Sequence, residues 1–296
     1  MSQILDILVA GILLGAVYGL VALGLNLIFG VVRIVNFAQG ELVMLAMYGT
    51  YWLYVRFGID SYVAILIVAP ALFALGVVLQ RLVLAPLQDE PMMQVFATFG
   101  LVLLFQNLVL GATQGEALSI DWPFARTVIA FAGVNVNVAR LVVLVALTAI
   151  TVALHLFLRD TMPGRAVRAV IQDKRAARAM GIDVERVFLL TVGTGAALAG
   201  VAGALLAPIF TLSPEIGSNF ILAAFAVVVL GGLGSLWGAY MGGLMVGVVE
   251  AFAGFYIDPA LRQAIWFVIF IAVLILRPAG LLGQVGAEEV GFRGQQ

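Results

Sequence analysis

Most side chains that could do chemistry in this sequence are isolated amides, hydroxyls and acids within long apolar stretches. A polar group at membrane depth is costly unless it has a partner, so such groups are candidates for a translocation path or for contacts between helices. These residues are Asn26, Asn36, Gln39, Glu41, Thr98, Gln106, Asn107 and Glu250. We take them together as the candidate path.

The two acids in this group each have a structural alternative. Asn36 could cap a helix, which would place Glu41 in the first turns, where a carboxylate complements the helix dipole. Glu250 lies deeper in an apolar run, and its alternative role is a pairing with a backbone donor or a neighbouring helix. Either acid could therefore stabilise the bundle without touching a solute.

A second group of polar residues is concentrated in residues 159–186, RDTMPGRAVRAVIQDKRAARAMGIDVER. This loop contains seven of the fifteen Lys and Arg residues. Asp173 is a suitable N-cap, Ala176 and Ala177 favour a helix, and Gly181 is a natural stop. Helices this short are marginal alone and need a surface to dock against. The alternative is a plain basic loop that only marks one side of a membrane.

The first part of the same loop predicts a further helical piece. Thr161–Gly164 contains Pro163 and suits a helix start, with Arg165–Gln172 following it. Whether this piece and the one after Asp173 form one helix or two stays open at this stage.

The amino-acid composition indicates whether this chain lies in water or in a membrane. Of the 296 residues, 64% are hydrophobic and only 10% are charged, against about 25% charged in soluble domains. The chain must therefore be an integral membrane protein. It has no cysteine and a single histidine, His155, so we expect no disulfide and no metal site. The net charge of −1 gives no reason to expect a nucleic-acid partner.

The apolar stretches predict a polytopic all-α helix bundle of eight or nine transmembrane segments. A span needs roughly 17–25 residues. The predicted spans are 7–29, 40–57, 62–84, 95–111, 140–158, 187–210, 220–256 and 263–281. The stretch 220–256 is too long for one straight helix and is interrupted by glycines at 231, 232 and 234. It is either two segments or one span with a re-entrant turn.

Orientation follows from the basic residues, because short cytoplasmic loops are enriched in Lys and Arg. The 159–186 loop is the most basic and is placed in the cytoplasm, so the N-terminus is placed outside and the 112–138 loop outside. Arg277 and Arg293 then favour a cytoplasmic C-terminus and hence nine crossings.

Small residues recur at four-residue spacing in several spans. Examples are Gly11, Gly15 and Gly19 in the first span, and Gly243 with Gly247 near the end. Such faces allow close approach of helix backbones. They serve either packing within this bundle or an interface with another subunit.

Motifs for nucleotide chemistry are missing from the sequence. The only lysine, Lys174, is not preceded by glycine, so no phosphate-binding GxxxxGK[ST] loop exists. There is no HExxH and no GxSxG. We therefore expect no enzyme, and any uphill transport must take its energy from another chain or from an ion gradient.

Several segments together resemble a known family. LGLNLIFG at 23–30, RIVNFAQGE at 33–41, GRAVRA at 164–169, AMGI at 179–182 and LGGLGSLWGA at 230–239 are similar to motifs of the LivH-type branched-chain amino-acid permeases of ABC importers. RAARAMG at 175–181 resembles the xAAxxxG core of the loop by which such permeases contact their ATPases, with Arg175 in place of the usual acid. The resemblance covers about residues 5–283.

The resemblance implies a single permease domain over residues 1–296, in the bacterial cytoplasmic (inner) membrane. It implies a homologous LivM-type permease as partner, two cytoplasmic ATPase subunits carrying ATP and Mg, and an external solute-binding protein. No cofactor is expected in this chain. By the same resemblance, the residues that couple to an ATPase would be Pro163, Gly164, Arg165, Arg168, Asp173, Arg175, Ala176, Ala177, Arg178, Gly181 and Ile182.

Two alternatives are kept open. The chain could be an ion-coupled secondary transporter or channel that works without ATPases, with Glu41 or Glu250 as the coupling acid. Within the importer class, the substrate could be a branched-chain amino acid, another amino acid, urea or a short amide.

Overall fold

The structure is a computed structural model that describes residues 2–88, 90–131, 134–258, 261–276 and 280–282. Its long helices are α1 (Ser2–Val32), α2 (Gln39–Phe57), α3 (Ile65–Leu79), α4 (Pro91–Thr113), α6 (Val138–Asp160), α9 (Val184–Leu206), α10 (Ile216–Gly231), α11 (Leu236–Tyr256) and α12 (Arg262–Leu276). The shorter helices are α5 (Pro123–Arg126), α7 (Met162–Gln172) and α8 (Lys174–Ala179). Helix α3 continues through a π-helical turn, Gln80–Leu84, and a 3-10 turn, Ala85–Leu87.

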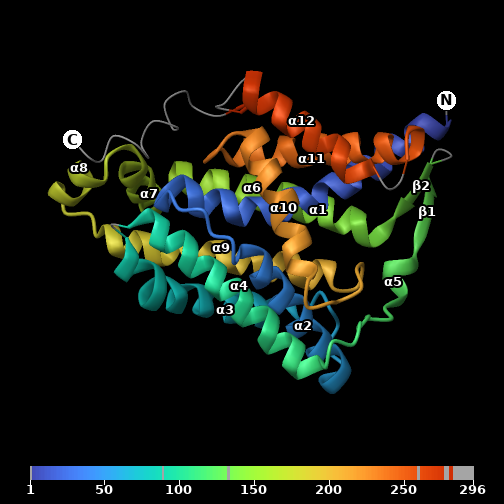
Figure 1. The fold of residues 1–296 in the computed structure, drawn as a ribbon, viewed down its shortest axis with the longest axis horizontal. Helices are drawn as coiled ribbons and strands as arrows, with labels where there is room; N and C mark the ends of the chain where they lie inside the picture. Colours follow the sequence, from blue (N-terminus) through green and yellow to red (C-terminus); the bar gives the residue numbers. More distant parts are fainter. Residues whose placement is uncertain (1, 89, 132–133, 259–260, 277–279, 283–296) are drawn as a thin grey trace.

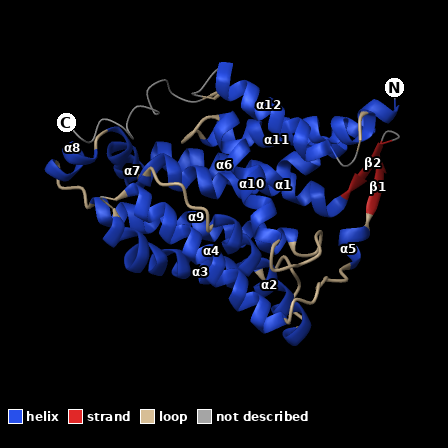
Figure 2. Ribbon diagram, in the orientation of Figure 1, coloured by secondary structure: helices blue, strands red, loops and turns tan. Residues whose placement is uncertain are grey.

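Helices make up most of the described chain (Figure 2). Strands β1 (Val128–Phe131) and β2 (Val134–Asn137) form one antiparallel hairpin, in which Val128 pairs with Asn137 and Phe131 with Val134. The hairpin lies in the predicted 112–138 loop, for which the sequence predicted only the side of the membrane. Because it is small and peripheral, the chain remains an all-α polytopic membrane protein.

Six helices in the described residues are long and apolar enough to cross a membrane: α1, α3 with its following turns, α4, α6, α9 and α11. Helices α10 and α12 are apolar but shorter. The predicted 220–256 span is in fact two helices, α10 and α11. Arg277 and Arg293, on which the predicted side of the C-terminus depended, lie outside the described residues.

Glycines and one asparagine explain the break between α10 and α11. Gly232 and Gly234 have φ of 107° and 82°, which other residues rarely adopt. The Asn26 side chain on α1 holds this turn from both sides: its Nδ2 donates to the Ser235 carbonyl (2.6 Å), and its Oδ1 accepts from the Gly234 N–H (2.7 Å). Ser235 then caps α11 by accepting from the Gly238 N–H.

Helix α1 lies at the centre of the bundle and contacts α6, α9, α10 and α11. A Cβ built on Gly15 would lie 2.5 Å from the Gly243 carbonyl oxygen, so α1 and α11 pack with almost no space between backbones. Gly203 on α9 likewise packs against the Val43 carbonyl of α2. The small-residue faces are thus covered within this chain, and the packing alternative is confirmed for them.

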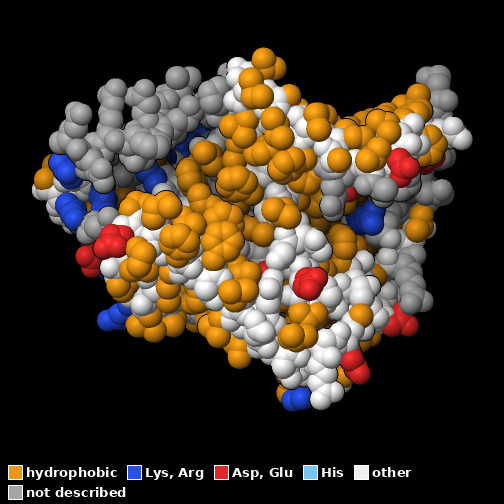
Figure 3. Space-filling view, in the orientation of Figure 1, with side chains coloured by type: hydrophobic (Ala, Val, Ile, Leu, Met, Phe, Trp, Pro, Cys, Tyr) orange, Lys and Arg blue, Asp and Glu red, His pale blue; other side chains and the backbone are white. Residues whose placement is uncertain are grey.

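The two ends of the bundle differ. Helices α7 and α8 lie at one end, beside the ends of α1, α6 and α9, and the β1–β2 hairpin lies at the other (Figure 1). We call residues Thr161–Ile182 the platform. On the face shown in Figure 3, hydrophobic side chains cover most of the surface and Lys and Arg gather near the platform. Helix α10 runs steeply across the bundle, from the side of α2 to that of α12 (Figure 1).

Candidate functional site

Three polar side chains from three helices meet inside the bundle, and we call them the polar triad. Gln106 of α4 donates from Nε2 to Glu41 Oε1 of α2 (3.0 Å) and also contacts Ser218 Oγ of α10 (2.9 Å). Ser218 Oγ donates to the same Glu41 oxygen (3.3 Å). The Glu41 side chain is fully buried, and its Oε2 has no hydrogen-bond partner among the described residues. The triad therefore has one unused acceptor, which is buried against Gly217 in this structure.

The triad forms where two helices begin. A Cβ on Gly217 would lie 2.5 Å from Glu41 Oε2, and Gly40 packs equally closely on the Gly217 carbonyl. Only glycines allow the first turns of α2 and α10 to touch in this way. Because helix N-termini carry partial positive charge, a carboxylate placed against two of them is stabilised. Glu41 lies in the first turn of α2, which is the position that its structural alternative predicted.

The triad lies well inside the bundle, away from both ends. Gln39, at the start of α2, donates from Nε2 to the Gly195 carbonyl (2.9 Å), near the middle of α9. The Gln39 side chain is fully buried, and Glu41 follows two residues later. Residues 33–38 connect α1 to this start without forming a helix. Helix α2 therefore starts part way along the bundle, at the depth where an unpartnered acid would be most costly.

An aromatic cluster lies beside the triad on the same elements. The ring of Phe37, before α2, stacks on Phe99 of α4 with centroids 4.4 Å apart and lies 6.4 Å from Phe225 of α10. Phe99 precedes Gln106 by two helical turns, and α4 begins near the platform. The aromatic cluster therefore lies next to the triad, on the side of the triad that is nearer the platform. The cluster and the triad together form a partly exposed face of α2, α4 and α10.

The other predicted path residues do not join the triad. Asn26 holds the α10–α11 turn, and Asn107, which is exposed, donates to the Leu103 carbonyl of its own helix. Thr98 is buried and donates to the Val95 carbonyl of its own helix. Glu250 is buried on α11. The structure thus brings only Glu41 and Gln106 of the predicted set into direct contact.

One expectation about Asn36 is wrong. The N-cap of α2 is Ala38, which contributes no side-chain hydrogen bond. Asn36 Oδ1 instead accepts from the Ala38 N–H (3.1 Å). Asparagine closes such short turns readily, and here it shapes the chain just before the helix rather than capping the helix itself.

The platform consists of two helices, which settles the question that the sequence left open. Thr161 caps α7 by accepting from the Gly164 N–H (3.0 Å), with Pro163 in the first turn. Asp173 has extended backbone angles and separates α7 from α8. Its Oδ1 accepts from the N–H groups of Arg175 (2.7 Å) and Ala176 (3.0 Å), as predicted for an N-cap. These bonds lower the pKa of the Asp173 carboxyl.

The end of α8 is also as predicted. Gly181 has φ of 82°, and the Ile182 N–H donates to the Ala177 carbonyl (3.0 Å). A glycine at this position satisfies the last carbonyls of a helix without strain.

Apolar contacts attach the platform to the bundle. Val170 of α7 and Ala177 of α8 are 3% exposed and pack with residues of α1 and α9. Arg33, just after α1, donates to the Ile171 carbonyl (3.0 Å), and the Lys174 ammonium lies 5.2 Å from the Phe188 ring centroid of α9. Helices too short to persist alone thus gain the docking surface that they need.

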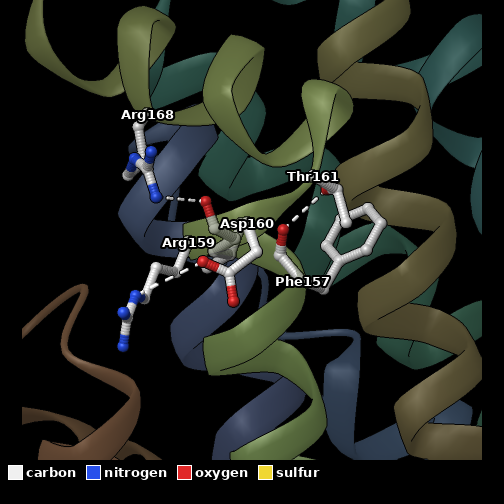
Figure 4. A network of polar contacts seen from close by, with 6 residues as sticks. Phe157, Arg159, Asp160, Thr161 and Arg168 are labelled. Atoms are coloured by element: carbon white, nitrogen blue, oxygen red, sulfur yellow. Dashed lines mark hydrogen bonds and ion pairs between the residues drawn. The ribbon is translucent and has the colours of Figure 1, made fainter.

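The junction between α6 and α7 is especially close. A Cβ on Gly164 would collide with the Phe157 carbonyl of α6. Arg168 donates to the Leu158 carbonyl, Thr161 Oγ1 to the Phe157 carbonyl, and Arg159 Nε lies 3.3 Å from Asp160 Oδ1 (Figure 4). The platform is therefore held directly against the end of α6.

Several predicted coupling residues face solvent. The exposed members are Pro163, Arg165, Arg168, Asp173, Arg175, Ala176, Arg178 and Gly181. Gly164 and Ala177 are buried, and Ile182 is half-buried. The first set is available to another protein, whereas the second holds the platform on the bundle.

Sequence reasoning missed Ser218, Arg33 and the three phenylalanines. Ser218 could have been noticed in the small and polar run Gly217-Ser218-Asn219 at the head of an apolar stretch. The phenylalanines carry no local signal, because apolar residues are expected everywhere in a membrane chain. In the described residues no group of three His, Asp or Glu side chains could hold a metal ion.

Comparison with known proteins agrees with this arrangement. The family model described as "Branched-chain amino acid transport system / permease component" matches residues 7–274. The chain is 30% identical to the high-affinity branched-chain amino acid transport system permease protein LivH of Salmonella typhimurium, covering 95% of this chain and 96% of the relative. It is 30% identical to the BraD permease of Pseudomonas aeruginosa (96% and 97%) and 31% identical to a probable LivH of Methanocaldococcus jannaschii (89% and 88%).

No solved structure matches the chain. The relatives are transport permeases, which agrees with a chain whose described residues include six helices long and apolar enough to cross a membrane. The resemblance drawn from the sequence motifs is therefore confirmed, and the chain belongs to the family of permease components of branched-chain amino acid transport systems.

Proposed function

We propose that this chain is the membrane subunit of an ATP-driven importer and forms half of a path for branched-chain amino acids. The observation that carries the proposal is the family match over residues 7–274. A homologous LivM-type permease would form the other half. Two cytoplasmic ATPases, which hold ATP and Mg, and an external binding protein would complete the assembly. Other amino acids, urea or short amides are the alternative substrates within this class.

The path in this proposal follows the face formed by α2, α4 and α10. Its polar part is the triad, where Glu41 Oε2 has no hydrogen-bond partner among the described residues. This oxygen is packed against Gly217, so α2 and α10 would have to separate slightly before it accepts a hydrogen bond from the ammonium group of an amino acid. Its apolar part is the cluster of Phe37, Phe99 and Phe225, which suits an aliphatic side chain. The face is partly exposed in this chain. A second permease placed against it would enclose the route.

Coupling in this proposal passes through the platform. Its exposed basic residues would contact an ATPase, and its attachment to α6, α9 and α1 would carry the motion into the bundle. The platform would then lie in the cytoplasm and the chain in the bacterial inner membrane. The whole chain, residues 1–296, would act as one permease domain.

The number of crossings is part of the same proposal. The six long apolar helices together with α2 and α12 make eight, and α10 would make a ninth. With the N-terminus outside, nine crossings place the C-terminus in the cytoplasm and eight place it outside. A C-terminal tag that a membrane-impermeant reagent reaches only from the cytoplasmic side would support nine crossings.

Replacing Glu41 with glutamine tests the path. A hydrogen bond to a charged group is worth about 1.5–3 kcal/mol, so we expect leucine uptake by the complete importer in proteoliposomes to fall roughly tenfold or more. Glu116→Gln, at an exposed position between α4 and α5, is the matched control and should transport normally. Normal uptake by Glu41→Gln would remove the acid from the path and leave it a structural role.

The ion-coupled alternative is tested in the same vesicles. Its supporting feature is the buried Glu41, because intramembrane acids commonly carry coupling ions. Leucine uptake that is driven by an ion gradient in vesicles containing this chain without ATPases would refute the importer proposal. Uptake that requires ATP and the ATPases would support it.

A further inference from the structure

A crevice of about 540 Å³ lies between α1, α6, α7 and the first half of α9. Its volume is in the range of small-molecule sites, roughly 300–1,000 Å³. The walls are almost entirely apolar, with Leu27, Leu154, Phe157, Val167, Val187 and Leu190 among them. Phe157 and Leu190 are 44% and 47% exposed, so the crevice is open at its rim. The triad does not line it, and of the predicted coupling residues only Pro163 and Ile182 do.

The position of the crevice corresponds to one leaflet of a bilayer. Its lining follows α9 from Asp183, at the start of the helix, to Thr194. Eleven helical residues rise by about 16 Å, close to half of the ~30 Å hydrocarbon thickness. Both α6 and α9 are long and apolar enough to span. The crevice therefore runs from the platform-side interface to about the middle of the membrane.

The charged residues of the crevice lie only at its interfacial end. Arg186 is exposed there, and the described residues include no ion pair for its side chain. The one acid of the lining, Asp183, uses Oδ1 to cap α9 by accepting from the Arg186 N–H (3.0 Å). Arg168 of α7 adds positive charge beside the crevice, because it donates to the carbonyl of Leu158, a lining residue. The deep end is neutral, because the Thr194 hydroxyl donates to the Leu190 carbonyl (2.7 Å).

We propose that this crevice binds an anionic phospholipid, with an acyl chain along the apolar walls and the phosphate at Arg186. Basic pockets between membrane helices recognise anionic headgroups, and an acyl chain matches the length and polarity of the walls. Three wall residues, Pro163, Ala166 and Val167, belong to α7. The bound lipid thus contacts the platform as well as the bundle. The inference requires only that the chain lies in a bilayer, so it holds or fails independently of the importer proposal.

The headgroup is tested by charge removal. The full chain is exposed to mixed phosphatidylcholine and phosphatidylglycerol, and native mass spectrometry measures which lipid each protein molecule retains. A single arginine near the surface contributes about a fivefold preference for an anionic lipid. Arg186→Gln should lose this preference, whereas Arg140→Gln, at the opposite end of α6, should keep it. Equal preference in the wild type and Arg186→Gln would refute the phosphate contact.

The acyl-chain position is tested by filling the crevice. Ala166→Trp places a large side chain between α7 and α9, so it should reduce retention of both lipids. Unchanged retention by this variant would refute the site. A third test uses Leu190→Cys, which introduces the only cysteine into this chain. The new thiol should react with a thiol-reactive lipid. Crosslinking to a second protein chain instead would refute the lipid site. That result would identify the crevice as a subunit interface.

Discussion

The polar triad and the platform both depend on side-chain oxygens at helix starts, but they use them in different surroundings. In the platform, Thr161 and Asp173 cap their own helices, and most charged groups face solvent. In the triad, Glu41 is fully buried, and its partners come from helices far away in the sequence. Solvent can replace a lost contact in the platform, whereas only the protein can do so in the triad. Substitutions in the triad should therefore lower stability and function far more than substitutions in the platform.

The largest effect is expected from Gly217→Ala. The added methyl group would lie 2.5 Å from Glu41 Oε2 and separate α10 from α2. Overpacking of this kind costs about 1–3 kcal/mol, and the buried carboxylate would also lose its partners. We expect a clear fall in melting temperature in detergent together with loss of uptake. Gly100→Ala on α4 is the matched control, because nothing lies within 4 Å of its added methyl group. Equal stability of the two variants would contradict the close contact.

A smaller effect, confined to coupling, is expected from Gly164→Ala. The methyl group would collide with the Phe157 carbonyl and push α7 away from α6, while the main bundle stays intact. Melting temperature should change little, but ATP hydrolysis by the assembled importer should no longer produce uptake. Gly111→Ala, at the end of α4 with open space around it, controls for helix propensity. Coupled transport by Gly164→Ala would show that the junction is not needed to transmit motion.

Removing one hydroxyl from the triad should have a moderate effect. In Ser218→Ala, Gln106 still donates to Glu41, but the two hydrogen bonds of the Ser218 hydroxyl, one to Glu41 and one from Gln106, are lost, each worth about 1 kcal/mol. We expect a detectable fall in stability and a partial fall in uptake, between those of the wild type and Glu41→Gln. Ser213→Ala, in the turn before α10, is the matched control. A loss as complete as that of Glu41→Gln would mean that Ser218 has a direct role with the solute.

The smallest effect should come from acid pH on α8. The pKa of Asp173 is lowered by the Ala176 and Arg175 N–H groups, so its cap contributes stability above the unfolded pKa. This contribution is lost as the pH falls through the folded pKa, below the ordinary value of 3.8. The protection of residues 174–180, measured as their hydrogen-exchange rates divided by the intrinsic rates at each pH, should therefore be constant near neutral pH and fall only in strong acid. Asp173→Asn keeps a capping oxygen and should remove this acid response; a response that persists would assign it to another group.

The sequence predicted the helix ends of the platform because their signals are local, although it left open whether the platform has one helix or two. Asp173, Gly181 and Thr161 act on residues only a few positions away, and each local pattern has one structural meaning. The break at Gly232 and Gly234 was visible for the same reason. Only the structure shows that this break separates two helices rather than a span and a re-entrant turn. The hairpin was missed because its strands have only four residues each.

The triad could be predicted only in part, because its contacts are long-range. Glu41 and Gln106 were identified as polar residues in apolar runs, but nothing near either of them indicates that they meet. Ser218 was missed because a serine in a membrane helix usually bonds to its own backbone. Asn26 was expected in the path, yet it holds a turn 208 residues away. In a membrane chain, polarity selects the candidates, and only the packing of the helices separates structural residues from those on the candidate path.

The meeting of α2 and α10 also has a consequence for biosynthesis. Glu41 leaves the ribosome 177 residues before Ser218, so its carboxylate enters the membrane long before its last partner exists. During that interval water, lipid headgroups or an insertion factor must accommodate the acid. Helix α2 can settle at its final depth only when α10 arrives. A ribosome-stalled chain that ends before residue 216 should therefore hold α2 loosely, and the arrival of α10 should fix α2 in place.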